Sequence, residues 1–290
     1  MNANLLREYA SYPGLLRDLL RVKRRIEPER IVYGGDRRQY FLDFAPPGRE
    51  RCTAVIYIHG GGWDSGEPAM FRFIGQYFAL QGYRCFLPGY RHAPKFRYPA
   101  QAEDVCAAAG AILRRLDREG GPPRPAAVVG SSAGAHLGAL LCLDRQLQKQ
   151  FDLDPGRLAG FAGLGGPYDF EDGHPAVLYL LARKLFPVWE ERRQGAPREK
   201  LAFGGGIPLL VIHSPRDGVA GYENAWDFAR RARELGLPVR FFSVPPGRDS
   251  HSAYTAGIFL EGRENSPALD ALTDWLGRLE RLTYGKEEKQ

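Results

Sequence analysis

The sequence predicts an α/β protein with a mainly parallel central sheet covered by helices on both faces. Short apolar runs alternate with longer helical patterns along most of the 290-residue chain, which is typical of parallel strands joined by helical crossovers. Two of the runs, "AVIYI" and "LLVI", contain no charged residue, as expected of strands buried on both faces. A chain of this length is expected to build one large domain around a single core.

The expected elements follow from these patterns in order. Segment 1–30 carries leucines and tyrosines on a recurring face and is expected to form one or two amphipathic helices, an N-terminal helical cap segment. Strands are expected within the segments 30–35, 39–48, 52–63, 84–91, 126–130, 158–170, 207–217 and 239–246. Helices are expected at 68–83, 99–120, about 133–146, 221–236 and 268–282.

The alternation is interrupted once, at about 168–206. That stretch contains the helical pattern "HPAVLYLLARKLFPVWEERRQ", which no strand follows promptly. We interpret it as an insertion, a small helical cap, within a main domain that spans 31–285. Because ligands of parallel sheets bind beyond the carboxyl ends of the strands, a substrate pocket is expected there, or else a packed lid. The candidate pocket residues are Trp63, Tyr179, Phe186 and Trp189.

Composition excludes several classes of partner. The 40 Lys and Arg against 34 Asp and Glu give a net charge of +6, but the densest basic run, 21–30, includes acidic residues and no aromatics, so no nucleic-acid partner is expected. No segment has a secretory signal pattern or the roughly 20 apolar residues of a membrane span, and the expected location is the cytoplasm. The cysteines form no C-x-x-C pair and are expected to be free thiols: Cys52, Cys85, Cys106 and Cys142.

The stretch "VVGSSAGAHLGAL", residues 128–140, carries the first chemical signal. The spacing G-x-S-x-G fits Ser132, flanked by Gly130 and Gly134, and does not fit Ser131. The serine follows an expected strand and precedes an expected helix, which is the context of a nucleophile elbow. The alternative is a close crossing of helix and strand with no catalytic role.

The stretch "HGGGW", residues 59–63, favours catalysis. Three glycines directly after a strand leave their backbone N–H groups unobstructed. Together with the N–H of Ala133, such donors stabilise the oxyanion of a tetrahedral intermediate. His59 is expected to hold this loop by hydrogen bonds rather than act as a base.

A serine nucleophile needs a base and a carboxylate that orients the base. His251 follows the last expected strand, and Asp217 follows the penultimate one, so both would lie at the same edge of the sheet as the serine. Asp249 is the second candidate for the acid, and Glu171 and Asp172 are weaker candidates. His136 and His213 are expected to be structural. His92 and His174 precede the expected acid in the chain, whereas the expected order places the base after the acid.

The motifs "HGGGW", "YRHAP…YPAQAEDV", "GSSAGAH", "HSPRD" and "SHSAY" together resemble the α/β-hydrolase fold, in the hormone-sensitive-lipase-like carboxylesterase family. The resemblance runs from about Ile31 to the last helix, and "GSSAGAHL" with "GLGGPYDF" is most similar to kynurenine formamidase and prenylcysteine methylesterase. It implies Ser132 as nucleophile, Asp217 as acid and His251 as base. It also implies an oxyanion hole formed by the backbone N–H groups of Gly61, Gly62 and Ala133. It implies no metal and no organic cofactor.

These observations predict a serine hydrolase that cleaves a small to medium ester, with an apolar acyl or aryl group, through an acyl-enzyme. The alternatives are an amidase or formamidase, an acyltransferase or lactone-forming relative, and a non-catalytic receptor on the same fold. The expected partner is a small-molecule ester. The oligomeric state stays open between a monomer and a homodimer.

Overall fold

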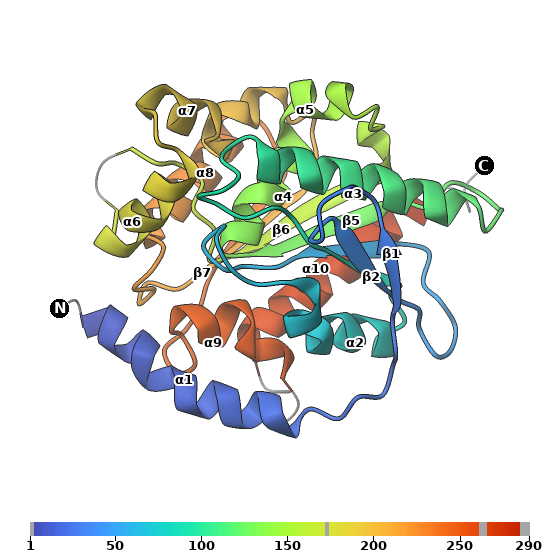
Figure 1. Ribbon diagram of the computed structural model, residues 1–290, viewed down its shortest axis with the longest axis horizontal. Coiled ribbons are helices and arrows are strands. Elements are labelled where there is room, and N and C mark those ends of the chain that lie inside the picture. Colours follow the sequence, from blue (N-terminus) through green and yellow to red (C-terminus); the bar gives the residue numbers. More distant parts are fainter. Residues whose placement is uncertain (1–2, 172–173, 261–265, 285–290) are drawn as a thin grey trace.

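The computed structural model describes residues 3–171, 174–260 and 266–284, and it has the architecture that the sequence predicts (Figure 1). The strands are β1 (Glu29–Val32), β2 (Tyr40–Phe44), β3 (Ala54–Ile58), β4 (Cys85–Pro88), β5 (Ala126–Ser131), β6 (Leu158–Leu164), β7 (Leu209–His213) and β8 (Val239–Ser243). The α-helices are α1 (Ala3–Arg21), α2 (Arg72–Leu80), α3 (Ala100–Asp117), α4 (Ala133–Leu143), α5 (Arg145–Gln150), α6 (Ala176–Leu185), α7 (Trp189–Gln194), α8 (Tyr222–Glu234), α9 (His251–Thr255) and α10 (Pro267–Tyr284). Short 3₁₀ helices are η1 (Pro68–Phe71), η2 (Pro155–Arg157), η3 (Pro197–Phe203) and η4 (Gly257–Phe259).

The strands form one eight-stranded sheet in the order β1-β2-β4-β3-β5-β6-β7-β8. The pairs β1–β2 and β2–β4 are antiparallel, and all the other pairs are parallel. The six strands from β4 to β8 in this order therefore point the same way. Their carboxyl ends lie together at one edge, where the candidate residues follow them.

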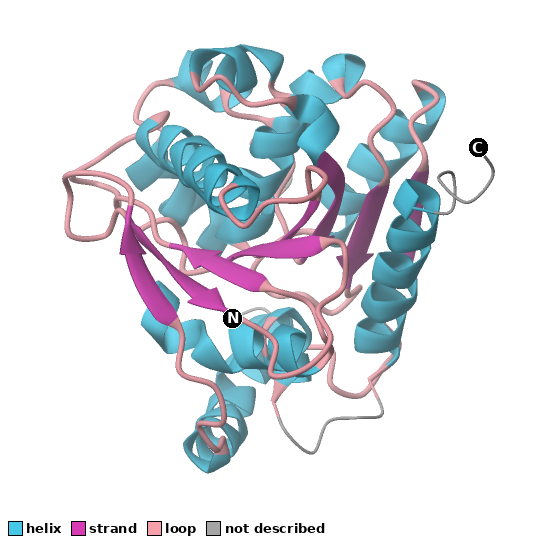
Figure 2. Ribbon diagram, turned by 90° about the vertical axis from the view of Figure 1, so that its right-hand side faces the viewer, coloured by secondary structure: helices cyan, strands magenta, loops and turns pink. Residues whose placement is uncertain are grey.

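Helices cover both faces of this sheet (Figure 2). One buried cluster joins strand side chains such as Ile56 and Val128 to α3, α4 and α8. The other joins the alternate side chains, such as Val55 and Val129, to α2 and α10. Successive residues of a strand point to opposite faces, so the uninterrupted apolar runs of β3 and β5 fill both clusters. This confirms the predicted α/β fold class.

The helix that follows the elbow is shorter than expected. It ends at Leu143 rather than near Gln146, and the separate helix α5 begins at Arg145 with Asp144 as its N-cap. The Asp144 carboxylate accepts hydrogen bonds from the backbone N–H groups of Gln146 and Leu147, and such N-capping favours a new helix start over continuation. The sequence expectation overlooked this capping aspartate.

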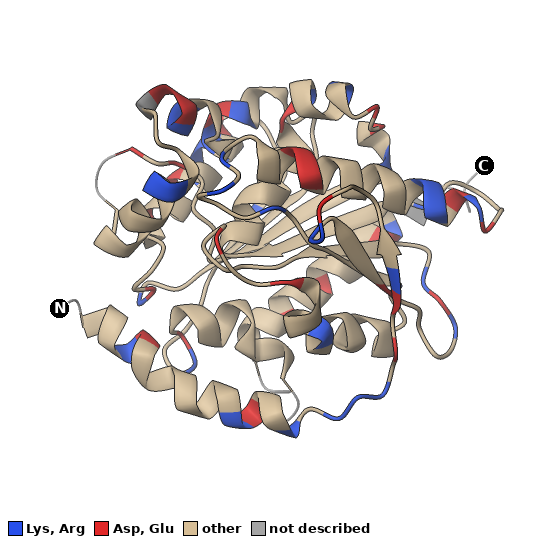
Figure 3. Cartoon of the chain, viewed as in Figure 1, with Lys and Arg blue, Asp and Glu red and all other residues tan. Residues whose placement is uncertain are grey.

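Charged residues of both signs are interleaved around the periphery, and the central strands carry few of them (Figure 3). Cys85, Cys106 and Cys142 are buried and Cys52 is exposed, all as free thiols. Among the described helices, none has the length and apolar character needed to cross a membrane.

Candidate active site

Ser132 lies on a strained turn between β5 and α4. Its backbone has φ 53° and ψ −122°, a left-handed region that a residue with a side chain rarely adopts. The turn lifts Ser132 out of the core, so that it is partly exposed while its neighbour Ser131 is buried. This is the geometry of a nucleophile elbow.

The flanking glycines are required by close backbone approach. A Cβ on Gly130 would lie 2.3 Å from the carbonyl oxygen of Gly134, and a Cβ on Gly134 would lie 2.0 Å from that of Ile58. Backbone atoms of a buried sheet cannot move aside as a flexible side chain would. The spacing of the glycines therefore reflects the crossing of α4 over β3 and β5, which is also the crossing that exposes Ser132.

We expect Gly134→Ala to destabilise the fold by roughly 2–4 kcal/mol, because the added methyl group overlaps the carbonyls of Ile58 and His59. Urea denaturation followed by circular dichroism measures this difference. Gly48→Ala is the matched control, since nothing lies within 4 Å of a Cβ there. Equal midpoints for the two variants would contradict the packing argument.

Ser131 does not share the partly exposed position of Ser132. Its hydroxyl shares a hydrogen bond of 2.7 Å with the hydroxyl of Tyr57, and both side chains are buried. The bond satisfies two polar groups inside the core. Ser131 is thus directed away from the sheet edge where Ser132 lies.

The glycine loop after β3 presents backbone donors beside the elbow. Gly61, Gly62 and Trp63 have φ values of 124°, 56° and 62°, and a Cβ on Gly60 would lie 3.1 Å from Cβ of Ser132. In the part of the chain that the structure describes, the N–H groups of Gly61, Gly62 and Ala133 donate to no other protein group. These three donors are the ones that the family resemblance implies for an oxyanion hole.

His59 holds the glycine loop by a contact with its first glycine. The Nδ1 atom of His59 lies 2.7 Å from the carbonyl oxygen of Gly60, and its ring stacks between Phe71 and Tyr90. Burial lowers the pKa of His59 to about 4. A neutral, buried imidazole of this kind fits the expected loop-holding role and not that of a base.

Asp217 and His251 are brought together by the loops after β7 and β8. The Nδ1 atom of His251 lies 2.7 Å from Oδ2 of Asp217. The other carboxylate oxygen, Oδ1, accepts from the backbone N–H groups of Val219 and Ala220 at 2.8 and 2.9 Å. The hydroxyl of Tyr254 also donates to Oδ2. Four donors therefore fix the carboxylate with one oxygen aimed at the imidazole.

This pair is electrostatically coupled. Burial by itself raises the pKa of Asp217, but the charge and hydrogen bond of His251, with the other donors, outweigh burial and lower the pKa to about 2. Burial lowers the pKa of His251, and the charge and hydrogen bond of Asp217 raise it further than burial lowers it. The arrangement suits a base that must carry a proton transiently.

The imidazole of His251 lies next to the elbow. The N–H of Ser132 donates to the carbonyl oxygen of Leu164 at 2.8 Å, and a Cβ on the following residue, Gly165, would lie 3.1 Å from Cε1 of His251. Among the hydrogen bonds of the described residues, none joins Ser132 Oγ to His251. Such bonds are often longer in unliganded enzymes and form when substrate binds.

The competing acids are placed elsewhere. Asp249 pairs with Arg216, with 3.3 Å between Oδ2 and Nη1. Glu171 is exposed, and Asp172 lies outside the described residues. Asp217 is therefore the carboxylate that contacts His251.

Tyr254 is a contributor that sequence reasoning missed. It follows His251 by three residues within "SHSAY", so both side chains project from one turn of α9. Helical spacing from the candidate base was the available signal. The sequence analysis placed Asp217 beside His251 but did not extend that contact to the residue three positions further along the turn.

Two predicted pocket residues are packed behind the glycine loop. Trp63 is 1% exposed and donates from Nε1 to Nδ1 of His136 at 3.2 Å, and Phe186 is 0% exposed and packs against the same ring. His136 in turn lies 2.7 Å from the carbonyl oxygen of Gly195 through Nε2. Neither aromatic side chain presents surface to a ligand in this conformation, so any influence on substrate would be indirect.

The inserted helices lie over this loop. Tyr179 on α6 is half-buried, and a Cβ on Gly62 would lie 2.8 Å from a methyl carbon of Leu181 on the same helix. The side chain of Trp189 lies outside the described residues. A pocket role for Tyr179 and Trp189 stays a prediction.

The remaining histidines are held by structural contacts. His213 is buried and lies 3.0 Å from the carbonyl oxygen of Ala220 through Nε2, and burial lowers its pKa. Burial also lowers the pKa of His92. His174 lies beside Asn224 in a cavity described below.

An apolar groove of about 750 Å³ borders the base. It runs between α1 and the segment that begins with Ser252, the residue after His251. Its other wall includes Phe71, whose ring stacks on His59. The lining residues are Tyr9, Tyr12, Pro13, Leu15, Leu16, Leu19, Met70, Phe71, Phe73, Ser252, Ala256, Gly257 and Leu260.

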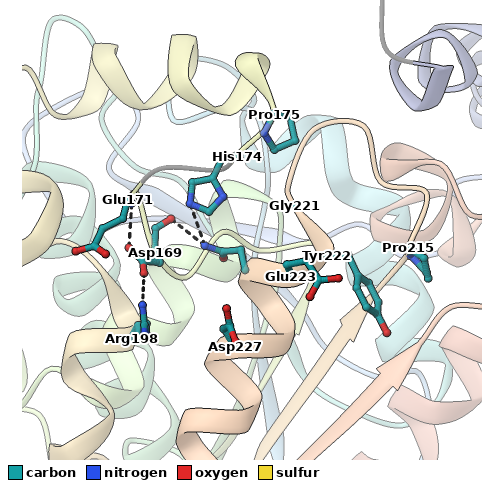
Figure 4. Close-up of a pocket in the computed structure, with 11 residues that line it drawn as sticks. Asp169, Glu171, His174, Pro175, Arg198, Pro215, Gly221, Tyr222, Glu223 and Asp227 are labelled. Atoms are coloured by element: carbon teal, nitrogen blue, oxygen red, sulfur yellow. Dashed lines mark hydrogen bonds and ion pairs between the residues drawn. The ribbon is translucent and has the colours of Figure 1, made fainter.

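A polar cavity of about 660 Å³ is lined in part by Pro215 and Gly221, which flank the acid loop (Figure 4). Asp169 pairs there with Arg198 at 2.7 Å, and Glu223 and Asp227 of α8 also line it. Its character is acidic, with one arginine among several carboxylates. It differs from the apolar groove in charge as well as in position.

Comparison with known proteins agrees with this fold. Residues 55–164 match the family described as α/β hydrolase fold. Over 99% of its length the chain superimposes on 98% of Esterase B from Lactobacillus rhamnosis, with a TM-score of 0.74 at 20% identity. The chain therefore has the α/β-hydrolase fold.

The chain is also similar to curated proteins that are named as esterases. The chain is 29% identical to Esterase LipC of Mycobacterium tuberculosis over 90% of its own length and 68% of the relative's. It is 25% identical to Esterase LipQ of the same organism over 88% and 62%, respectively. A shorter match, 25% identical over 48% of the chain and 34% of the relative, is to a probable isoprenylcysteine alpha-carbonyl methylesterase of Oryza sativa.

The chain thus has the α/β-hydrolase fold and is similar to proteins named as esterases, which agrees with the resemblance expected from its motifs. The predicted enzyme class, carboxylic ester hydrolase, agrees with the names of these relatives. The chain spans about two thirds of the length of the first two relatives.

Proposed function

We propose that this protein is a serine carboxylesterase in which Ser132, His251 and Asp217 form the catalytic triad. The observation that carries the proposal is the hydrogen bond between His251 and Asp217, at the same sheet edge as a strained serine elbow. The names of the curated relatives support the reaction class.

The proposed reaction begins with attack of Ser132 Oγ on the acyl carbon, while Nε2 of His251 takes the hydroxyl proton. Asp217 accepts the hydrogen bond from Nδ1–H and stabilises the imidazolium. The N–H groups of Gly61, Gly62 and Ala133 hold the oxyanion, each contributing a few kcal/mol to transition-state stability. His251 then gives its proton to the leaving alcohol. In the second half of the reaction His251 takes a proton from water, which attacks the acyl-enzyme, and the proton passes to Ser132 Oγ as the acid is released.

The proposed substrate is an ester with an apolar acyl or aryl group, which would lie in the groove along α1. Its walls are almost entirely aliphatic and aromatic, and it begins beside the base. Burial of an acyl chain there would contribute about 0.8 kcal/mol per methylene group. Longer chains should therefore bind better until the groove is filled.

A p-nitrophenyl ester series from acetate to decanoate tests this proposal. We expect kcat/KM to rise with chain length, and Leu16→Arg to reduce it about tenfold for octanoate and little for acetate. Leu20→Arg is the matched control, because Leu20 is on the same helix and 79% exposed but does not line the groove. Equal effects of the two variants would remove the groove from the proposal. Hydrolysis of N-formylkynurenine without any ester hydrolysis would favour a formamidase instead.

A further inference from the structure

The N-terminal helix buries a glutamate rather than its leucines. Among the residues of α1, Glu8 is the buried one, with 1% of its surface exposed, whereas Leu16 and Leu20 are 58% and 79% exposed. Burying a carboxylate is costly unless hydrogen bonds and charges compensate for it. The position of Glu8 therefore calls for a specific partner.

That partner is the first turn of α9, which carries the candidate base. The backbone N–H of Ser252 lies 3.1 Å from both carboxylate oxygens of Glu8, and the Ser252 hydroxyl donates to Oε1. Ser252 directly follows His251. In Figure 1, α1 runs alongside α9, and the two helices are in contact. Glu8 is the polar anchor of that contact.

No Lys or Arg of the described chain forms an ion pair with Glu8. The charge it acts on is that of His251, since the Glu8 carboxylate adds to Asp217 in raising the pKa of the imidazole against the effect of burial. On α1, Tyr12 faces Glu8, and its pKa is raised to about 12 by burial and by that charge.

The other titratable groups near His251 are not on α1. Tyr254 and His213 contact Oδ2 of Asp217, the same oxygen that His251 contacts. The Arg216–Asp249 pair joins the two loops that carry the acid and the base. Glu8 is therefore the charged group that α1 contributes to this cluster.

We propose that Glu8 is a positioning residue for the base: by holding Ser252 it fixes the start of α9 and the imidazole of His251, and its charge stabilises the imidazolium. This inference rests on the proposed function, since the imidazolium forms when Ser132 is deprotonated. In this proposal α1 contributes a charged side chain to the active site. The negative charge at the first turn of α9 is favourable for that turn as well.

Glu8→Gln tests the proposal. The amide keeps the size of the side chain and an oxygen that accepts from Ser252, but it removes the charge. Because a negative charge raises the pKa of His251, its loss lets that pKa fall, so the acid limb of kcat/KM against pH should move to lower pH by roughly half a unit. The weaker base should reduce kcat by up to about threefold, with little change in KM.

Two further variants separate charge from general damage to the helix. Asp18→Asn removes the same charge from α1 at a site where the aspartate pairs with Arg17, and it should leave both kcat and the acid limb unchanged. Ser252→Ala removes one donor to Glu8 and keeps the charge, so the acid limb should stay in place while kcat falls slightly. Wild-type kcat and an unmoved acid limb in Glu8→Gln would overturn the proposal.

Titration of His251 by NMR, with and without Glu8→Gln, gives a readout that needs no turnover. A lower pKa of the imidazole in the variant supports the inference, and an unchanged pKa overturns it. A wild-type protein that hydrolyses no ester and does not react with a fluorophosphonate probe would instead refute the proposed function. The two failures are therefore distinguishable.

Discussion

Ser132→Ala is expected to reduce ester hydrolysis by at least about 10⁴-fold and to abolish labelling by a fluorophosphonate probe. The variant removes the hydroxyl that would form the acyl-enzyme, and the remaining donors of the glycine loop sustain only a small residual rate. Initial rates with p-nitrophenyl butyrate and gel detection of the labelled protein measure the two effects. The elbow should still fold, since alanine keeps the Cβ of the serine.

Ser131→Ala is the matched control for this experiment. It removes a hydroxyl one residue away whose hydrogen bond is to Tyr57 inside the core, so it should cost about 1 kcal/mol of stability. Its activity and labelling should stay near those of the wild type. A reversed pattern, with Ser131→Ala inactive and Ser132→Ala active, would show that the nucleophile is Ser131 and contradict the proposal.

Asp217→Asn is expected to reduce kcat by about 10³- to 10⁴-fold. The N–H groups of Val219 and Ala220 both donate to Oδ1, so they would hold the amide oxygen of the asparagine at that position. Its NH₂ group would then face Nδ1 of His251 and donate to it. The proton of the imidazole would move to Nε2, and the nitrogen facing the serine could no longer accept a proton.

The acid limb of the pH–rate profile gives an independent measure of the same change. Without the carboxylate charge that raises it, the pKa of His251 should fall. Asp249→Asn is the control, because Asp249 pairs with Arg216 and not with the base. It should change kcat less than about tenfold. Comparable losses in the two variants would mean that the acid is not specifically Asp217.

Much of the fold could be predicted from local patterns. The uninterrupted apolar runs of β3 and β7 indicated strands buried on both faces, and the structure has them in a parallel order with both faces covered. The break at Asp144 was missed because the capping of α5 depends on the competition between two helix ends. Helix existence was predictable, and helix boundaries were less so.

Those parts of the candidate site that are formed by consecutive residues could also be predicted from the sequence. The elbow at Ser132 and the loop at Gly61 depend on a few consecutive residues whose lack of side chains is itself the signal. Chain order selected His251 and Asp217, and the structure brings these two into contact. Their catalytic roles stay predictions until the variants are measured.

The sequence by itself determined the fold class, the serine turn and the order of the acid and base. Only the tertiary structure decided which groups surround them: Tyr254 on the acid, Tyr57 on Ser131, and Glu8 on the turn that carries His251. Strands and tight turns can be predicted from adjacent residues, because the steric limits that define them act over a few bonds. Contacts such as that between Glu8 and Ser252 join residues 244 apart, and they depend on how α1 packs, which no short pattern specifies.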